Sequence, residues 1–381
     1  MQNQVVVLDI GSSKVTALIG ERGVNKTFLI KGFSEREYSG FTDGQFLDVQ
    51  SFSGAVKAAI REVREITRVK IAKVYVGVPG EFTTVITKNH HIAFSKKKKI
   101  RERDLDELFD VAFPFKGESY RIINRSAVWY ELDDYRKMAD PIGCVSEVLK
   151  GSLSYVLCDT GFINTLSPIL EEGGVREVEY VSSALAEVLY LFEAEQRDRI
   201  CVLLDIGYIT ASFSVVKGDG IIYQKSFAYG GGYITGLLSE ILGVEPDIAE
   251  KLKRKINLTC GENGDNYNVI DGDNEYNFSV KNVNDIVVYS LDELCESISA
   301  CLADAKISIP EYVPISVTGG GVSYIRGAKE HLSNRLNMLV EVVAPKLPHL
   351  NKPIESSYIA LLDLALTQAP QKEGLFQKLF N

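Results

Sequence analysis

Two stretches of the chain have nearly the same sequence: VVVLDIGSSKVTALIG at residues 5–20 and CVLLDIGYITASFSVV at residues 201–216. They align without gaps, so that Asp9 in the first stretch falls on Asp205 in the second. Each stretch begins with a continuous apolar run, which is typical of a strand that is buried on both faces. A second apolar run follows the shared Asp-Ile-Gly segment. Each copy therefore predicts a strand, a tight turn and a second strand.

The turn in each copy has the features of a phosphate-binding site. Gly11 and Gly207 let the backbone turn sharply and come close to a ligand. The exposed N–H groups of such a turn can form an anion-binding nest. An acidic side chain beside it would repel a phosphate unless a cation lay between them, so we interpret Asp9 and Asp205 as ligands of Mg²⁺, through water. The alternative is two unrelated β-hairpins, which a single copy would favour.

Composition limits the class of protein. A chain of 381 residues can form two sizeable cores, so we expect two or more domains. The net charge of −9 argues against binding to nucleic acid, which requires a basic surface. The sequence predicts neither a signal peptide nor a membrane-spanning helix. The six cysteines lack the spacing of a metal or redox site, and together these features indicate the reducing cytoplasm.

Three further segments predict the other walls of a nucleotide site. In YGGGYITGLL, residues 229–238, glycines precede a helical pattern, and a helix N-terminus favours phosphate. In ISVTGGGVSYI, residues 315–325, a glycine-rich turn between a strand and a helix would let a base or ribose rest on the backbone. In DIAEKLKRKIN, residues 247–257, a glutamate could hold ribose hydroxyls and two cations could flank adenine. The alternative for this last segment is an exposed ion pair between neighbouring helical turns.

The order of these segments resembles the actin and heat-shock-chaperone ATPase superfamily. Within it, the sequence is most similar to the FtsA family of bacterial cell-division proteins. The likeness extends with gaps over residues 5–366, and further segments carry it: GFTDGQFLDV at 40–49, KVYVGVPGEF at 73–82 and DPIGC at 140–144.

This resemblance implies an α/β fold in which two RNase-H-like halves enclose a nucleotide cleft, with an FtsA-type 1C subdomain. The implied domain boundaries are 1–80 (1A, first part), 81–158 (1C), 159–195 (1A, continued), 196–230 (2A), 231–310 (2B), 311–350 (2A, continued), 351–366 (closing helix of 1A), 367–374 (tether) and 375–381 (membrane-targeting tail). Within the predicted 2B, the polar residues 261–277 are expected to form loops.

The resemblance also implies ATP and Mg²⁺ as cofactors. The residues expected to bind phosphate are Gly11, Ser12, Ser13, Lys14, Gly207, Thr210, Gly230, Gly231 and Gly232. Those expected to bind adenosine are Glu250, Lys253, Arg254, Gly319, Gly320, Gly321 and Ser323.

The second turn departs from the family pattern Asp-Ile-Gly-Gly-Gly-Thr-Thr-Asp. Tyr208 and Ile209 replace two glycines, and Ser212 replaces the closing aspartate. The two larger side chains would crowd the approach to the γ-phosphate. We therefore expect ATP turnover near background, in a diverged FtsA or a paralogue.

The implied partners are those of a division protein. The resemblance implies self-assembly into filaments through 1C, binding of the C-terminal tail of FtsZ through 2B, and recruitment of later division proteins. The expected location is the cytoplasmic face of the membrane at the division site. The alternatives are a pilus-assembly scaffold that binds the tail of an inner-membrane protein, a sugar or acetate kinase, and an ATPase chaperone.

Two charged or amphipathic segments remain. The final residues, EGLFQKLFN, place large apolar side chains on one face of a short helix, which resembles a membrane-targeting tail: Leu375, Phe376, Leu379 and Phe380, with Lys378 on the polar face. The alternative is a tail that packs on the protein's own core. The run of lysines at residues 96–99 is expected to be a solvated loop before a helix at 101–112, the alternative being a patch for an anionic partner.

Overall fold

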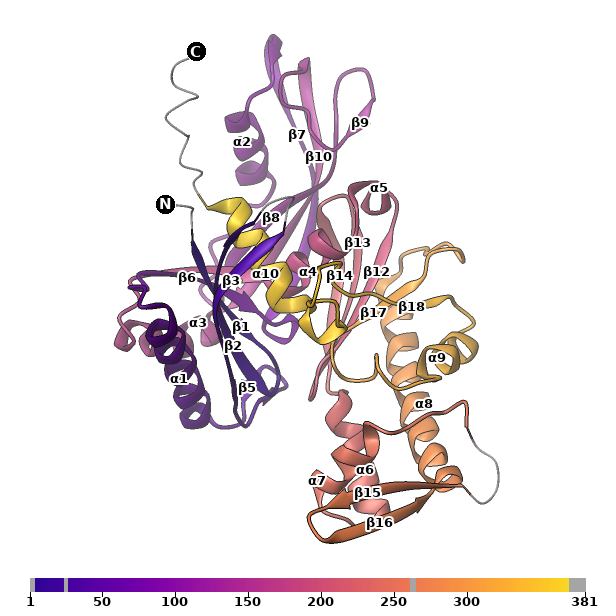
Figure 1. Ribbon diagram of the computed structural model, residues 1–381. Helices are drawn as coiled ribbons and strands as arrows, with labels where there is room; N and C mark the ends of the chain where they lie inside the picture. Colours follow the sequence, from indigo (N-terminus) through magenta and orange to yellow (C-terminus); the bar gives the residue numbers. More distant parts are fainter. Residues whose placement is uncertain (1–3, 24–26, 261–264, 370–381) are drawn as a thin grey trace.

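The computed structural model describes residues 4–23, 27–260 and 265–369 (Figure 1). The first half contains a five-stranded sheet with the order β11-β6-β1-β2-β3. Its strands are β1 (Val5–Ile10), β2 (Lys14–Arg22), β3 (Phe28–Glu37), β6 (Lys73–Val78) and β11 (Glu177–Ser182). The predicted tail at residues 375–381 and most of the predicted tether lie outside the described residues.

Helices cover both faces of this sheet. Residues of β1 alternate between the two faces, because successive side chains of a strand point in opposite directions. Val6 and Leu8 join the core under α1 (Val49–Thr67) and α3 (Thr160–Glu172). Val5 and Val7 pack instead with α10 (Ser356–Gln368). The continuous apolar run of β1 is thus explained by burial on both sides.

The second half repeats this arrangement. Its sheet has the order β14-β13-β12-β17-β18, from β12 (Cys201–Ile206), β13 (Ala211–Lys217), β14 (Gly220–Phe227), β17 (Ile315–Thr318) and β18 (Val340–Val342). Strand β1 pairs antiparallel with β2 and parallel with β6, and β12 pairs in the same ways with β13 and β17. Asp9 lies opposite Thr16, and Asp205 lies opposite Ser212. The two predicted strand–turn–strand units are confirmed.

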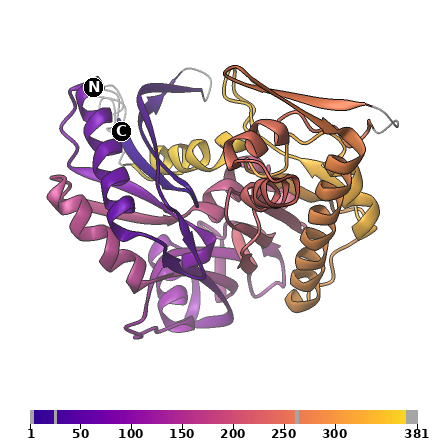
Figure 2. The same ribbon diagram turned by 90° about the horizontal axis from the view of Figure 1, so that it is seen from below.

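Seen from below, the two halves lie side by side with α10 between them (Figure 2). Helix α4 (Ser183–Leu191) packs against α10 and joins the apolar cluster that includes Leu203 of β12. The N-terminal end of α10 contacts the second half, where Thr318 Oγ1 and Ser356 Oγ are 2.7 Å apart. These two helices therefore form the floor between the halves.

A smaller sheet with the order β7-β10-β8-β9 extends from the first half (Figure 1, top). It consists of β7 (Thr83–Lys99), β8 (Tyr120–Glu131), β9 (Lys137–Met138) and β10 (Val145–Asp159), with α2 (Glu102–Ala112) on one face. The prediction of a loop at residues 96–99 is wrong, because this run ends β7: Lys98 pairs with Ser146 of β10 and also forms an ion pair with Asp104.

A group of helices and one hairpin lies at the far end of the second half (Figure 1, bottom). The elements are α6 (Gly231–Leu242), α7 (Pro246–Lys253), β15 (Asn266–Asp271), β16 (Asn274–Ser279) and α8 (Val280–Ala305). The expectation of loops at residues 261–277 is wrong for the described part, because β15 and β16 pair along their full length. The reason is a tight turn at Gly272, which has a positive φ of 58°. No helix in the described ranges is long and apolar enough to span a membrane.

Candidate functional site

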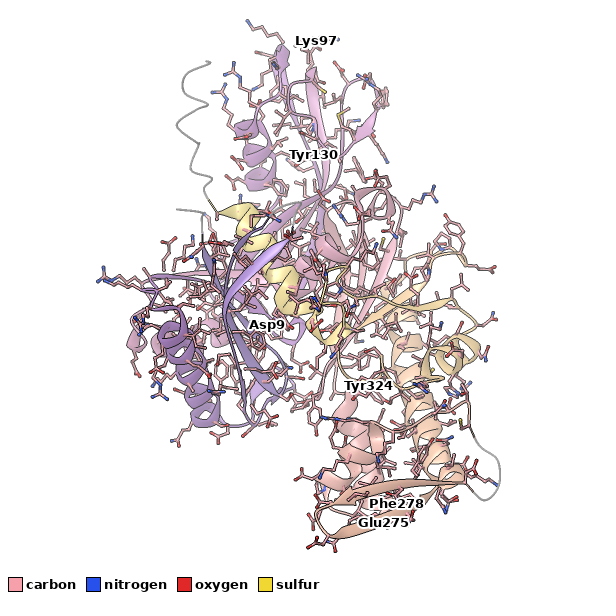
Figure 3. All side chains as sticks on the ribbon, viewed as in Figure 1. Asp9, Lys97, Tyr130, Glu275, Phe278 and Tyr324 are labelled. Carbon is pink, nitrogen blue, oxygen red and sulfur yellow. The ribbon has the colours of Figure 1, made fainter. Side chains whose placement is uncertain are left out.

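A cavity of about 880 Å³ opens between the two halves and is lined by both turns. Figure 3 shows Asp9 near the centre of the molecule and Tyr324 in the second half, and both residues line this cavity. The predicted site residues that line it are Asp9, Gly11, Ser12, Ser13, Lys14, Asp205, Gly207, Thr210, Glu250, Lys253, Arg254, Gly319 and Gly320. The other predicted site residues of the described core lie outside this lining: Gly230, Gly231, Gly232, Gly321 and Ser323.

Strand alternation brings Asp9 and Asp205 to the same space. Asp9 lies on the face of β1 that carries Val5 and Val7, and Asp205 lies on the face of β12 that carries Leu203. Both faces point toward the floor formed by α4 and α10. Burial raises the pKa of Asp9 to about 6, although a 2.7 Å hydrogen bond from Ser357 Oγ partly opposes the shift. Burial and the negative charge of Asp9 raise the pKa of Asp205 to about 7.

Sequence reasoning missed a third carboxyl group, Glu187 of α4. It lines the cavity, is 2% exposed, and its Oε1 atom has no hydrogen-bond partner. Burial and the charges of Asp205 and Asp9 raise its pKa well above the ordinary value. The available signal was a lone acidic residue in the apolar helix sequence SALAEVLYL, because a buried glutamate is uncommon without a partner.

The donor set suits a hard cation only in part. Asp9, Asp205 and Glu187 offer carboxylate oxygens, which Mg²⁺ prefers. However, within the described ranges no group of three or more His, Cys, Asp or Glu side chains is arranged to hold a metal ion. A Mg²⁺ ion here would thus need water or ligand oxygens for most of its coordination, as the predicted contact through water requires.

The first turn is fixed by its own backbone and by neighbouring side chains. The Gly11 N–H donates to Lys14 O at 2.9 Å, and the Tyr38 hydroxyl donates to Gly11 O at 2.7 Å. Lys14 Nζ lies 2.7 Å from Glu35 Oε2 at the cavity edge. The ammonium group remains partly exposed, since 26% of the side chain is accessible. The first turn therefore presents a cation that can still reach solvent.

The second turn closes in the same way but has different neighbours. The Gly207 N–H donates to Thr210 O at 2.9 Å. Two carbonyl groups of this turn accept hydrogen bonds from the start of α6, from Gly231 N to Gly207 O and from Gly232 N to Tyr208 O. These N–H groups, which the sequence assigned to phosphate, therefore support the turn. The Ile209 N–H donates to Ser12 Oγ of the first turn at 3.0 Å.

The predicted adenosine wall contains a buried ion pair. Lys253 is 1% exposed and lies 2.6 Å from Glu250 Oε2. Its ammonium group also donates to Gly231 O at 2.8 Å and to Thr235 Oγ1 at 2.9 Å. Burial lowers the pKa of Lys253, and the bond to Glu250 opposes that shift. The three N–H groups of this lysine are thus engaged within the protein.

The glycine turn after β17 forms the opposite part of this wall. Gly319 has a φ of 84°, and a Cβ there would collide with Asp205 Oδ1 and Ile206 O. A Cβ at Gly320 would lie 2.9 Å from Ile354 Cδ1. The helix predicted directly after this turn begins only at Ala328, as α9 (Ala328–Leu336). Sequence reasoning did not find Ile354, which is near α10 and comes close to Gly320 only in the folded chain.

A family model described as "Cell division protein FtsA" matches residues 202–360. Curated proteins named "Cell division protein FtsA" also match: the Pseudomonas aeruginosa protein is 22% identical over 65% of this chain, the Streptococcus pneumoniae protein 25% over 65%, and the Escherichia coli protein 21% over 68%. The resemblance to FtsA is confirmed. The matches cover 60%, 54% and 61% of those three proteins, so the chain spans about three fifths of the length of these FtsA relatives.

The part that matches the FtsA model contains the second turn, α6, α7 and the Gly319–Gly320 turn. The first turn precedes the matched range, so its place in the site depends on the geometry described above. Solved structures show that the fold is actin-like. A PilM–PilN type IV pilus biogenesis complex aligns with a TM-score of 0.64, 16% identity and coverage of 96% of this chain and 99% of that chain. MreB5 of Spiroplasma citri bound to ADP aligns with a TM-score of 0.56, 12% identity and 95% coverage of both chains.

Proposed function

We propose that this chain is an FtsA-like, nucleotide-binding protein of bacterial cell division. The observation that carries the proposal is the pair of strand–turn–strand units whose aspartates, Asp9 and Asp205, line one cavity between two similar halves. Similarity to FtsA supports the division role, and the ADP-bound MreB5 neighbour supports a nucleotide ligand.

In this proposal ATP or ADP lies between the turns with Mg²⁺. The phosphates contact Gly11, Ser12, Ser13, Lys14, Gly207 and Thr210, and the start of α6 acts by fixing the second turn. Asp9 and Asp205 hold the ion through water. Adenosine lies against Gly319, Gly320 and the Glu250–Lys253 pair, near Arg254. When bound, the ion neutralises phosphate charge beside the two carboxylates. We expect turnover near background.

The nucleotide site is tested by calorimetry with Mg²⁺ in excess. We expect the parent chain to bind ADP or ATP and Gly320→Trp to lose binding, because an indole would fill the space beside Ile354. Gly54→Trp is the matched control, since a Cβ at Gly54 of α1 meets no atom within 4 Å. No heat of binding in the parent at about 1 mM nucleotide, which corresponds to a Kd weaker than about 1 mM, would contradict the proposal.

The division role requires contacts at two other places. We propose that region 231–310, as subdomain 2B, binds the FtsZ tail, and that region 81–158, as subdomain 1C, contacts the next subunit of a filament. Ile270 and Val145 are exposed apolar residues in these two regions, at 66% and 59%. Ile270→Asp should weaken binding of an FtsZ tail peptide in fluorescence anisotropy, and Val145→Asp should weaken sedimentation of filaments. Each variant is the control for the other. If Ile270→Asp and Val145→Asp each weakened both peptide binding and filament sedimentation to the same extent, the assignment of these two functions to the two regions would be contradicted.

We also propose that the tail at residues 375–381 anchors filaments to the cytoplasmic face of the membrane. A single tail would bind weakly, and a filament that displays many tails would bind well. Recruitment of later division proteins would follow from this position. In liposome co-sedimentation, Phe376→Asp should release the protein, because a charge among acyl chains is costly, whereas Gln377→Asp on the polar face should not. If both variants sediment like the parent, this segment is not the anchor.

A second candidate function is a scaffold for pilus assembly. The supporting observation is that the PilM–PilN complex aligns over 96% of this chain and 99% of that chain, whereas the FtsA relatives are covered over 54–61% of their length. Binding to a peptide from an inner-membrane pilus protein, with no binding to the FtsZ tail, would favour this alternative.

A further inference from the structure

The two turns touch at one point, between Ser12 and Ile209. The Ile209 N–H donates directly to Ser12 Oγ at 3.0 Å. A Cβ placed on Gly207 would also lie 3.0 Å from Ser12 Oγ. A phosphate oxygen bound by both turns would need about 2.7–3.0 Å to each of them. The direct bond therefore leaves no room for a phosphate group between Ser12 and Ile209.

The side chain of Ile209 keeps the two turns in contact at Ser12. A Cβ at Gly40 would collide with both Ser12 O and Ile209 Cδ1, so the isoleucine reaches from the second half to the backbone of the first. Gly40 has a φ of 88°, a backbone conformation that favours glycine. Because it has no side chain, it leaves space for Ile209 Cδ1. A β-branched side chain has few rotamers, so it cannot move aside readily. A glycine at position 209 would remove the side-chain contact and keep the N–H that donates to Ser12.

The carboxyl groups of the cavity also disfavour a third phosphate. Asp9, Asp205 and Glu187 all line the cavity that Ser12 lines. Lys14, the cation of the first turn, is already 2.7 Å from Glu35. Each additional phosphate brings more negative charge close to these carboxyl groups, and like charges repel strongly where solvent is scarce.

We propose that the site selects a nucleoside diphosphate over the triphosphate, with Ile209 as the residue that sets this specificity. The proposal rests on the nucleotide binding proposed above and specifies its ligand. The diphosphate occupies the space as far as Gly207 and Thr210, which line the cavity. The third phosphate of ATP must separate Ile209 from Ser12, and it lowers affinity by doing so.

Calorimetry with the full chain and excess Mg²⁺ tests this selection, with ADP and ATP as the two probes. We expect the parent to bind ADP at least about tenfold more tightly than ATP, because ATP must break a hydrogen bond and a packed contact. Ile209→Gly should lower the ratio of the two Kd values by improving ATP binding, because the packed contact is lost while the backbone N–H that donates to Ser12 remains. Ile66→Gly, which changes an exposed isoleucine of α1, should leave the ratio unchanged.

The outcomes separate the two proposals. ATP binding in the parent as tight as ADP binding, or an unchanged ratio in Ile209→Gly, overturns the selection and leaves nucleotide binding intact. No binding of either nucleotide overturns the nucleotide site and the selection with it. If Ile209→Gly fails to show the parent's cooperative thermal unfolding, Ile209→Ala gives the same test with a smaller change in backbone freedom.

Discussion

The first and second turns have the same backbone frame and different neighbours. In both, the glycine N–H donates to the carbonyl three residues later at 2.9 Å. In the first, Ser12 and Ser13 face the cavity, and Lys14 follows at its edge. In the second, carbonyl groups receive the start of α6, and Ile209 contacts Ser12. Both turns line the cavity between the halves, whereas the residues after each glycine differ, and the proposed selection between nucleotides depends on that difference.

Lys14 of the first half and Lys253 of the second half also have different neighbours. Lys14 is partly exposed and has one carboxylate partner, Glu35. Lys253 is buried and has three oxygen partners, on Gly231, Thr235 and Glu250. A buried ammonium group needs such partners because water cannot solvate it. From this comparison we expect Lys253 to act mainly in stability and Lys14 mainly in the proposed nucleotide binding, and substitutions at each lysine test this expectation.

The largest expected effect is that of Lys253→Met on stability. Methionine fills similar space but leaves the partly buried Glu250 with only the exposed Arg254 as a cationic partner and leaves Gly231 O without its donor. Removing one member of a buried ion pair costs about 3–5 kcal/mol. Urea unfolding should show this loss. Lys251→Met in the same helix is the control: its ion pair with Asp271 is exposed and contributes about 1 kcal/mol or less. Equal losses in the two variants would contradict the assignment.

A smaller effect is expected from the carboxyl groups that the two halves bring together. Burial raises the pKa of Asp9 to about 6, so the folded protein retains a proton that the unfolded chain has released. This contribution to stability is complete below about pH 4 and is lost as the pH rises to about 6. Asp9→Asn removes the titration, so the free energy of unfolding of this variant, relative to the parent, should increase by about 3 kcal/mol over that range.

Asp104 provides a control of opposite sign. It is also buried, which raises its pKa, but hydrogen bonds from Lys98 and from the Arg101 N–H outweigh burial and lower it. Its contribution is present above the ordinary carboxyl pKa and is lost only as the pH falls below about 4. Urea unfolding from pH 4 to pH 7 should thus show a changing difference for Asp9→Asn and a constant one above pH 5 for Asp104→Asn.

Sequence alone predicted the repeated part of the fold because that part depends on local patterns. Buried apolar runs followed by Asp-Ile-Gly are visible in the sequence itself, and β1–β2 and β12–β13 form where expected. Residues 96–99 were predicted wrongly as a loop because their lysines indicate solvent but not pairing. They extend β7 because β10 lies beside them, which a local pattern does not contain. The β15–β16 hairpin was missed because its residues are mostly polar.

The cavity residues were predictable to the extent that each belonged to a motif. Asp9, Asp205 and the glycines of the turns have recognisable neighbours in the sequence. Glu187, Ser357 and Ile354 come from helices α4 and α10 and the turn before α10, and only the assembly of the halves brings them to the cavity. The internal engagement of Lys253 was also not predictable, because exposure of a helical lysine depends on what packs against its face.

The smallest expected effect on stability is that of Lys14→Met, and it is the one that separates the two lysines most clearly. The Lys14–Glu35 pair is partly exposed, so its loss should cost less than about 1 kcal/mol in urea unfolding. Nucleotide affinity should nevertheless fall, because the side chain lines the cavity and is the cation of the first turn. Removing a charge-assisted hydrogen bond to phosphate weakens binding by about tenfold or more. Lys57→Met, which breaks the exposed ion pair between Lys57 of α1 and Glu172 of α3, is the matched control and should change neither nucleotide affinity nor stability by more than about 1 kcal/mol. A large loss of stability with unchanged affinity in Lys14→Met would reverse the comparison, since Lys14 would then act as Lys253 does, by holding its own half together.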